Sequence, residues 1–259
     1  MLKKLAPALA FSLVAASNGF AAMPLITDDT GTQGAGGNQL ELSVTQEKMK
    51  DASTGADTKS LQLPALSFTR GVSETIDVFV AATWLKNTDN TSGATEKGSS
   101  NPSLGVKWRL FENERKTSVA LKAVYAFPVS EEKQTKSLGD GKGSWDSTLI
   151  LSQELPFGSA HANIGIGKIG VKNGNDEKTT HISVAPMFNV GESAKLVFDL
   201  GQDTAKADGA NKSTTRYWEI GGIYSPSKDI DLAVGYVRSK LKNSEEITKA
   251  ITAGLTWRF

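Results

Sequence analysis

Apolar and polar residues alternate along most of this chain. In the final segment, residues 251–259 (ITAGLTWRF), every odd position is apolar and Thr, Gly, Thr and Arg lie between them. A period of two is typical of a β-strand with one apolar and one polar face. No stretch between residue 38 and the C-terminus combines sustained helical periodicity with a cap. The pattern therefore predicts a strand-rich fold with little helix.

The alternating segments have the length of membrane-spanning strands. About ten residues suffice for a tilted transmembrane β-strand. The segments are 38–47, 60–69, 75–85, 102–110, 117–128, 145–155, 160–171, 179–189, 194–202, 214–224, 230–240 and 247–259. We predict an all-β fold, a single transmembrane antiparallel β-barrel of 12 strands.

The connections between these segments also alternate. Five are tight and rich in turn-forming residues: 70–74, 111–116, 156–159, 190–193 and 225–229. The other six tend to be longer, polar and often lysine-rich, among them 48–59, 86–101 and 130–144. Short turns at one end and long loops at the other are typical of outer-membrane barrels, whose short turns face the periplasm. An even strand number places both chain ends on that side.

Aromatic residues favour a bilayer over a soluble β-sandwich. All five tryptophans lie at apolar positions of their strands, near strand ends, while aliphatic residues fill most of the middle. Membrane–water interfaces select such belts, whereas a soluble core would gather the rings centrally. Phe68, Phe188 and Tyr224 belong to the short-turn belt, and Phe127 to the long-loop belt. We expect membrane anchoring by Trp84, Trp108, Trp145, Trp218, Trp257 and Phe259.

The N-terminus indicates export. Residues 1–21 have a basic start, a short apolar stretch and small residues before Ala22, the three regions of a secretory signal peptide. We predict a lead at 22–37, periplasmic or lumenal, and a barrel at 38–259 in the cell outer membrane. The sequence has no cysteine and a formal charge of +1, without a basic run, so a nucleic-acid partner is not expected.

Two segments carry a family resemblance. Residues 23–44 (MPLITDDTGTQGAGGNQLELSV) and 63–80 (LPALSFTRGVSETIDVFV) resemble the outer-membrane transporter family named for the meta-pathway of phenol degradation. The resemblance implies transport of small, aromatic or hydrophobic molecules. The final strand ending on Phe259 resembles the C-terminal signal of Gram-negative outer-membrane proteins, which implies recognition by the barrel-assembly machinery. The expected partners are this machinery, the lipid bilayer and a small solute.

The polar face of the strands should line the barrel lumen. Its charged and histidine residues are Glu41, Asp77, Lys107, Arg109, Lys122, Glu154, His161, His181, Lys195, Asp199, Glu219, Asp231 and Arg258. As transport-pathway candidates we take Asp77, Lys107, Arg109, Lys122, Glu154, Asp199, Glu219 and Asp231. The mixed signs argue against a large pore selective for one sign of charge.

Lumen size leaves two functions open. Twelve strands give a backbone radius of roughly 12 Å, which leaves room for a small solute at most. Small inward residues such as Gly221, Gly235 and Gly254 make open volume plausible. We predict a narrow channel; the alternative is a non-conducting structural barrel that acts through its extracellular loops.

No metal, cofactor or catalytic site is expected. Asp28, Asp29 and Thr30 offer oxygens to a cation, but they lack the spacing of an EF-hand, so we interpret them as part of the lead. His161 and His181 lie about eight residues apart along the barrel, roughly 26 Å, and cannot share a site. No Gly-x-Ser-x-Gly motif accompanies either histidine. We therefore do not expect an enzyme.

Three prolines, Pro64, Pro128 and Pro186, test the strand assignment, because proline cannot donate a ladder hydrogen bond. Pro128 falls at a strand end, where this donor is not needed. The apolar parity changes at Pro64, where we predict a β-bulge. Pro186 falls on the apolar face of its strand without an evident reason.

Overall fold

A computed structural model describes residues 23–259, so the predicted signal peptide at 1–21 lies outside the described residues. Residues 23–259 form thirteen strands and one short helix, α1 (Glu131–Thr135). The strands are β1 (Asn38–Asp51), β2 (Ala56–Gly71), β3 (Ile76–Asp89), β4 (Thr95–Ser99), β5 (Ser103–Glu112), β6 (Thr117–Ala126), β7 (Ser144–Leu155), β8 (Gly158–Ile169), β9 (Glu177–Val190), β10 (Ala194–Ala207), β11 (Ser213–Ser227), β12 (Ile230–Leu241) and β13 (Glu246–Arg258).

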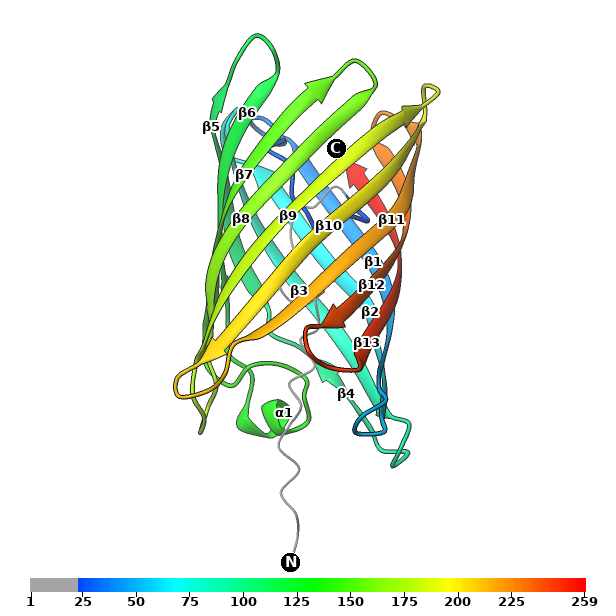
Figure 1. Ribbon diagram of the computed structural model, residues 1–259. Coiled ribbons are helices and arrows are strands. Elements are labelled where there is room, and N and C mark those ends of the chain that lie inside the picture. Colours follow the sequence, from blue (N-terminus) through cyan, green and yellow to red (C-terminus); the bar gives the residue numbers. More distant parts are fainter. Residues whose placement is uncertain (1–22) are drawn as a thin grey trace, which may run out of the picture.

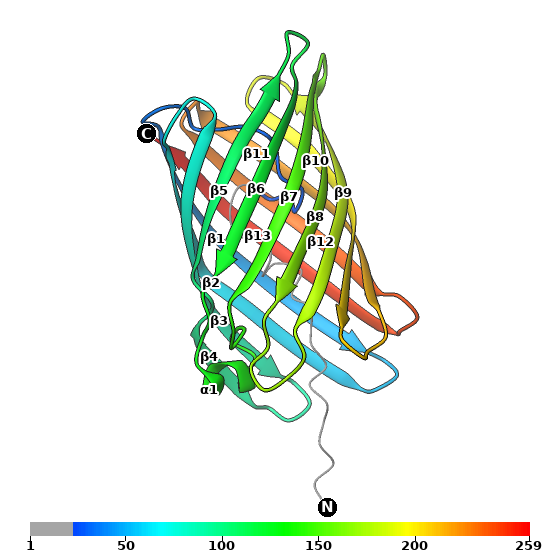
Figure 2. The same cartoon turned by 90° about the vertical axis from the view of Figure 1, so that its left-hand side faces the viewer.

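The strands close into one antiparallel barrel (Figures 1 and 2). The first strand, β1, pairs with the last, β13, over its whole length. Strands β4 and β5 both pair with β3, so together they occupy one position, and the barrel has twelve positions as predicted. The backbones of Asn38 and Phe259 exchange two hydrogen bonds at the rim that carries the short turns. Closure thereby leaves no free edge for lipid to cover.

The strands are longer than expected at the other rim. Residues 48–59 and 86–101 were predicted as long loops, but β1 continues to Asp51, β2 starts at Ala56, β3 reaches Asp89 and β4 forms within the second loop. Beyond the bilayer both faces of the sheet meet water. Polar residues can therefore occupy both faces while the strands continue to pair. The long connection at 130–144 is confirmed as a loop around α1. We call this end the long-loop rim and the opposite end the short-turn rim.

The prolines behave differently. The pairing of β2 with both neighbours shifts between Gln62 and Ala65, which confirms the bulge predicted at Pro64. At Pro186 the ladder between β9 and β10 is interrupted without a change of register. The missing N–H explains this local gap.

The outer face of the barrel is apolar and the inner face is polar. Exposed side chains include all five tryptophans and a broad set of Leu, Val and Ile residues. The predicted belts are thus present, with Trp84 half exposed on one and Trp108 on the other. Within residues 23–259, no helix is long and apolar enough to cross a membrane.

Two aromatic residues lie inside the barrel, where sequence reasoning did not expect them. Phe79 and Tyr217 are almost fully buried and face Gly105 and Gly201 on the neighbouring strands. A Cβ at either glycine would come within 2.5 Å of the ring opposite. The inward glycines therefore provide space for these rings rather than open volume.

Candidate functional site

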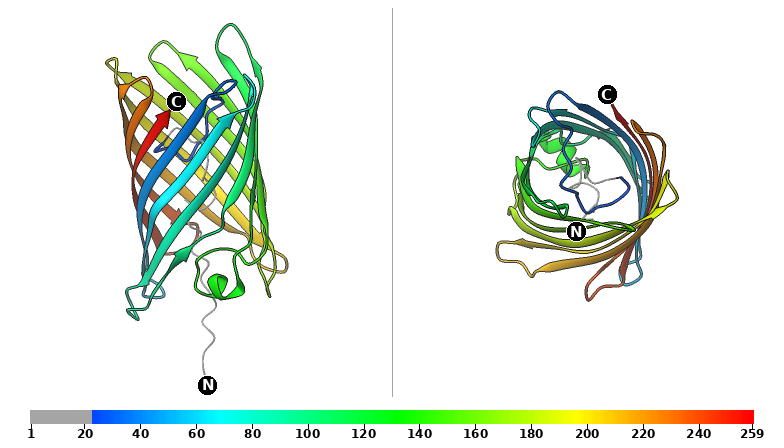
Figure 3. Two further views of the ribbon diagram at one scale, coloured as in Figure 1. Left: turned by 180° about the vertical axis from the view of Figure 1, so that it is seen from behind. Right: turned by 90° about the horizontal axis from the view of Figure 1, so that it is seen from above.

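Segment 23–37, which we call the lumenal segment, lies inside the barrel (Figure 3, right, blue). It contacts side chains from most strands of the wall. Leu25, Thr27, Asp28 and Thr30 are buried, with exposed fractions of 4 % or less. A segment without regular secondary structure is buried only where its polar groups find partners, and the wall supplies them.

The first part of the segment docks by apolar contacts. Leu25 packs into a cluster of inward residues from β9 to β12, and Ile26 packs against a second cluster that includes Tyr217. Pro24 lies over two glycines: a Cβ at Gly221 or Gly235 would come within 2.6 or 2.7 Å of its ring. Small wall residues that suggested open volume therefore accommodate the lumenal segment instead.

The next residues bind a wall carboxylate. Asp199 of β10 accepts hydrogen bonds from the backbone N–H groups of Ile26 and Thr27, at 3.0 and 2.6 Å, and from the Thr27 hydroxyl at 2.7 Å. Tyr217 donates to the same carboxylate at 3.2 Å. A single buried carboxylate thus satisfies consecutive backbone donors of an irregular segment.

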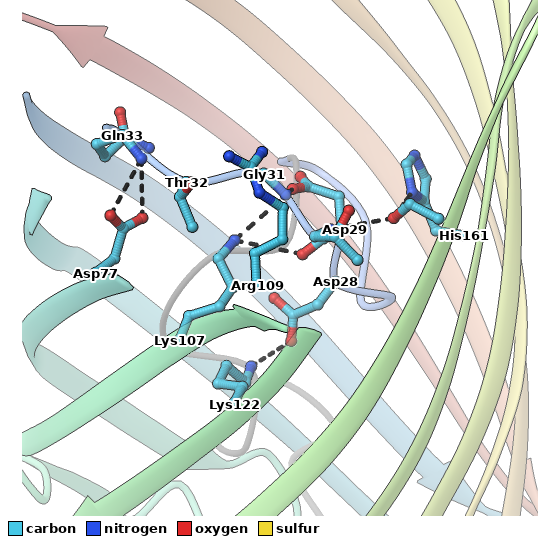
Figure 4. A network of polar contacts seen from close by, with 12 residues as sticks. Asp28, Asp29, Gly31, Thr32, Gln33, Asp77, Lys107, Arg109, Lys122 and His161 are labelled. Atoms are coloured by element: carbon cyan, nitrogen blue, oxygen red, sulfur yellow. Dashed lines mark hydrogen bonds and ion pairs between the residues drawn. The ribbon is translucent and has the colours of Figure 1, made fainter. Parts of the chain in front are cut away.

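The acidic pair of the segment binds two lysines (Figure 4). Asp28 forms an ion pair with Lys122 of β6, and both side chains are only 4 % exposed. Lys107 of β5 lies 3.7 Å from the Asp29 carboxylate and donates to the Asp29 carbonyl at 3.3 Å. The two lysines face each other across the β5–β6 ladder. Asp28 and Asp29 therefore neutralise a like-charged pair that would otherwise repel.

The segment leaves the lumen along β3 and the short-turn rim. The hydroxyl of Thr30 lies 2.5 Å from that of Ser118, and its N–H donates to Ser152 at 3.1 Å. The Gln33 N–H donates to both oxygens of Asp77, at 3.1 and 3.0 Å (Figure 4). Gly36 adopts a φ of 85° as the chain turns into β1, a conformation that glycine tolerates.

Four of the eight predicted pathway residues therefore hold the lumenal segment: Asp77, Lys107, Lys122 and Asp199. Arg109, Glu154 and Asp231 lie toward the short-turn rim. There Arg109 pairs with Glu112 at 3.2 Å, Asp231 pairs with Arg258 at 2.6 Å, and Glu154 is exposed. The other polar residues of the inner face are also divided between the lumen and the rim: Glu41 is buried and Lys195 is exposed.

Glu219 is unlike the other acids. Its side chain is 2 % exposed, and within residues 23–259 its closest hydrogen-bonding contact is a weak one with the backbone N–H of Ile26. It lies beneath Pro24, close to Gly235. Glu219 lies at the point where the lumenal segment meets β11 and β12.

A cavity of about 450 Å³ remains between the lumenal segment and the short-turn rim. Its lining combines both signs of charge, from Asp29, Glu41, Lys107, Asp231 and Arg258. A volume of this size accommodates a small organic molecule. The cavity lies on the side of the segment where the chain enters β1.

Both histidines join polar arrays. His161 lies opposite Ala185 in the β8–β9 ladder, so the two histidines are four residues apart along the barrel, about 13 Å, and the predicted separation of eight residues is wrong. His161 lies 2.8 Å from Ser152 and 3.0 Å from Ser159. His181 lies 2.8 Å from Asp203 and 2.9 Å from Ser183, so its imidazole ring lies between a carboxylate and a hydroxyl. Sequence reasoning missed this arrangement because the three residues come from two strands. The hydroxyl of Ser183 lies 2.7 Å from that of Thr27 and is 5 % exposed. The lumenal segment therefore covers the serine.

Comparison with known proteins bears on the fold. No protein-family model and no curated protein matches this sequence. An outer membrane channel from Pseudomonas putida F1 superposes with a TM-score of 0.76 at 10 % identity, over 89 % of this chain and 98 % of that one. The β domain of the Bordetella autotransporter BrkA gives 0.57 at 12 % identity, over 87 % and 100 %. The translocator domain of NalP from Neisseria meningitidis gives 0.53 at 10 %, over 86 % and 89 %.

These similarities define a class. A closed antiparallel barrel with an apolar outer face between aromatic belts is an outer-membrane β-barrel. The resemblance of 23–44 and 63–80 to the meta-pathway transporter family has no support from sequence comparison.

Proposed function

We propose that this protein is a narrow outer-membrane channel for small solutes, constricted by the lumenal segment. The observation that supports the proposal most directly is the cavity that remains in the polar lumen beside the lumenal segment. The cavity beside the segment provides a vestibule at the short-turn rim. Passage requires either the remaining space around the segment or its displacement.

Conductance in a planar bilayer tests this proposal. The full chain, refolded and checked by heat-modifiable gel mobility, should give small discrete steps. Deletion of residues 24–33 should raise the step size several-fold, because the apolar and polar docking groups leave the lumen together. If the deletion variant folds and conducts no better, the lumen is closed by other groups and the channel proposal is wrong.

A substitution pair provides a milder test. Gly221→Ala places a methyl group within 2.6 Å of Pro24, whereas Gly222→Ala on the outer face meets nothing nearer than 3.7 Å. We expect Gly221→Ala to loosen the segment and raise conductance, because overpacking costs about 1–3 kcal/mol. Gly222→Ala should behave as the unmodified protein. Equal conductance of the two variants would contradict a constriction at Pro24.

The solute class rests on the family resemblance. We propose small aromatic or hydrophobic molecules, in keeping with the transporter family that residues 23–44 resemble. The prediction is that small phenols reduce the ionic steps of the full chain, while sugars of similar size do not. If phenols and sugars block the conductance steps equally, the channel proposal stands but the proposal of an aromatic substrate is wrong.

A non-conducting barrel that acts through its loops is the competing function. Under that alternative the deletion of 24–33 leaves the barrel electrically silent. We also propose that the barrel is not an enzyme, since Thr27 covers the Ser183 hydroxyl. A serine-directed fluorophosphonate should therefore leave Ser183 unlabelled, and stoichiometric labelling would reveal a hydrolytic site.

A further inference from the structure

Basic side chains face outward in a continuous row near the long-loop rim. The row, which we call the basic row, consists of Lys59, Lys48, Lys249 and Arg238, on β2, β1, β13 and β12. Each residue lies directly opposite the next across a strand pair. Figure 3 (left) shows β13, β1 and β2 side by side on this face.

Strand alternation establishes that the row faces outward. The residues next to it along the strands, Glu47, Met49, Ala250 and Val237, are buried inside the barrel. Lys48 and Lys249 are exposed. The row therefore points sideways, away from the lumen and toward the surrounding membrane.

The row lies at the edge of the apolar band. Arg238 lies opposite Trp218 of the long-loop belt, and the ring of Trp218 contacts Tyr236, with 5.6 Å between ring centroids. Aromatic belts mark the membrane–water interface. Cations at this level, pointing laterally, are at the depth of lipid head groups.

Asp57 is the acid that interacts electrostatically with the row, through Lys48, but its ion pair is with Lys50. Within residues 23–259, the members of the row form no ion pair and no side-chain hydrogen bond with each other or with the loops. Other lysines of this rim are matched: Lys142 and Lys168 pair with Asp176, and Lys172 pairs with Glu131. Like charges directly opposite each other destabilise a sheet. Four in succession attract an anion from outside the chain.

In the lumen, lysines that face each other across a ladder are neutralised by acidic residues. Lys107 and Lys122 also face each other across a ladder, and Asp28 and Asp29 bind them there. Outside, the next row toward the rim adds Lys50, Lys240 and Arg216, with Asp57 as the one acid, paired to Lys50 at 3.0 Å. The excess of positive charge thus extends over two rows.

We propose that the basic row binds the phosphorylated head group of an outer-leaflet glycolipid. Phosphates suit lysine and arginine because charged N–H groups donate short, strong hydrogen bonds to the phosphate oxygens. The aromatic belt beneath would contact the acyl chains. This inference is independent of conduction through the lumen.

The test compares lipids and matched variants. The full chain is refolded into phosphatidylcholine vesicles with or without bisphosphorylated lipid A, and its Tm is read from heat-modifiable gel mobility. Lys48→Gln with Lys249→Gln removes two charges from the row. Arg115→Gln with Lys228→Gln removes two exposed charges at the short-turn rim and serves as the control.

We expect lipid A to raise the Tm of the full chain and of the control, and to lose most of this effect on the row variant. Lipid A retained after detergent extraction, measured by mass spectrometry, should fall about fivefold per lysine removed. In pure phosphatidylcholine the row variant should be at least as stable as the full chain, because repulsion is relieved.

Three results would overturn the proposal. The row variant could retain lipid A as well as the control does. Dephosphorylated lipid A could stabilise the full chain equally, which would assign the effect to acyl chains. Phosphatidylglycerol could also raise the Tm of the full chain as much as lipid A does, which would mean that the row is attracted to any anionic membrane surface.

Discussion

The buried ion pair of Asp28 and Lys122 shows what single residues do in this lumen. Each side chain is 4 % exposed, so neither charge is solvated on its own. Removing one partner of such a pair leaves an uncompensated buried charge, whereas removing both can be nearly neutral. The pair thus sets the position of the lumenal segment more than it adds stability.

This leads to a residue-scale prediction. Lys122→Met alone should weaken docking of the segment by roughly 3–5 kcal/mol, and Asp28→Asn combined with Lys122→Met should recover most of the loss. Thermolysin cleavage at Leu25 and Ile26, which are buried in the docked segment or packed against its clusters, reports the change. A double variant cleaved as fast as Lys122→Met would show that the charges are not coupled.

The lysines also show how far residues can be predicted from sequence. Strand parity placed Lys107 and Lys122 on the inner face, and their opposition across β5 and β6 calls for an anion. Asp28 and Asp29 were recognised as ligand-like but not assigned to these lysines. Parity defines a face, whereas the partner across the lumen depends on the path of a segment that has no periodicity.

At the scale of elements, the long loops form an organised rim. The loop that carries α1 contacts its neighbours through Lys133 to Ser99 and Gln134 to the backbone of Lys172. Asp176 connects two loops by bonding Lys142, Lys168 and the N–H of Val171. These contacts hold extended hairpins that lie outside the bilayer.

A pH prediction belongs to this element. The hydrogen bond from Lys168, followed by that from Val171, holds the pKa of Asp176 below its ordinary value. A depressed pKa stabilises the folded loops above the unfolded value, about 4, and the contribution disappears as pH falls toward the folded value. Hydrogen exchange at 170–176, corrected for intrinsic rates, should stay constant from pH 8 to 5 and rise below about pH 4.

Asp176→Asn is the matched variant. It should exchange faster at every pH and lose the acid-dependent rise, because the charge that titrates is absent. Protection that stays unchanged in Asp176→Asn would mean that the loops are held by the contacts of α1 instead.

For the whole molecule, the decisive feature is how the lumenal segment and the wall share the lumen. Apolar contacts hold Leu25 and Ile26, and charged contacts hold Asp28 and Asp29, on different parts of the wall. A segment attached at several points moves only when these contacts break together. This arrangement suits a constriction that a permeating solute must displace.

The absence of cysteine makes a direct test feasible. The side-chain oxygens of Thr27 and Ser183 are 2.7 Å apart, so Thr27→Cys with Ser183→Cys should form a disulfide between the segment and β9. We expect solute flux to fall under oxidation and to recover with reductant. Either single-cysteine variant is the control, and flux that ignores the redox state would show that the segment need not move.

The barrel itself was determined by local sequence. Period-two alternation, aromatic positions and turn residues predicted the twelve positions, the outward tryptophans and the bulge at Pro64, because these depend on neighbours along a strand and on the solvent each face meets. Strand ends at the long-loop rim were missed, since both faces are polar there and periodicity disappears.

Only the tertiary structure decided what occupies the lumen. The sequence left residues 22–37 either periplasmic or lumenal and interpreted wall glycines as open volume. Folding brought Pro24 over Gly221, Asp28 to Lys122 and Thr27 to Asp199, contacts between residues 94 to 197 positions apart. An irregular segment has no repeating pattern to announce its place. Its position follows from the charges and spaces that a closed barrel presents, and these exist only once the last strand has met the first.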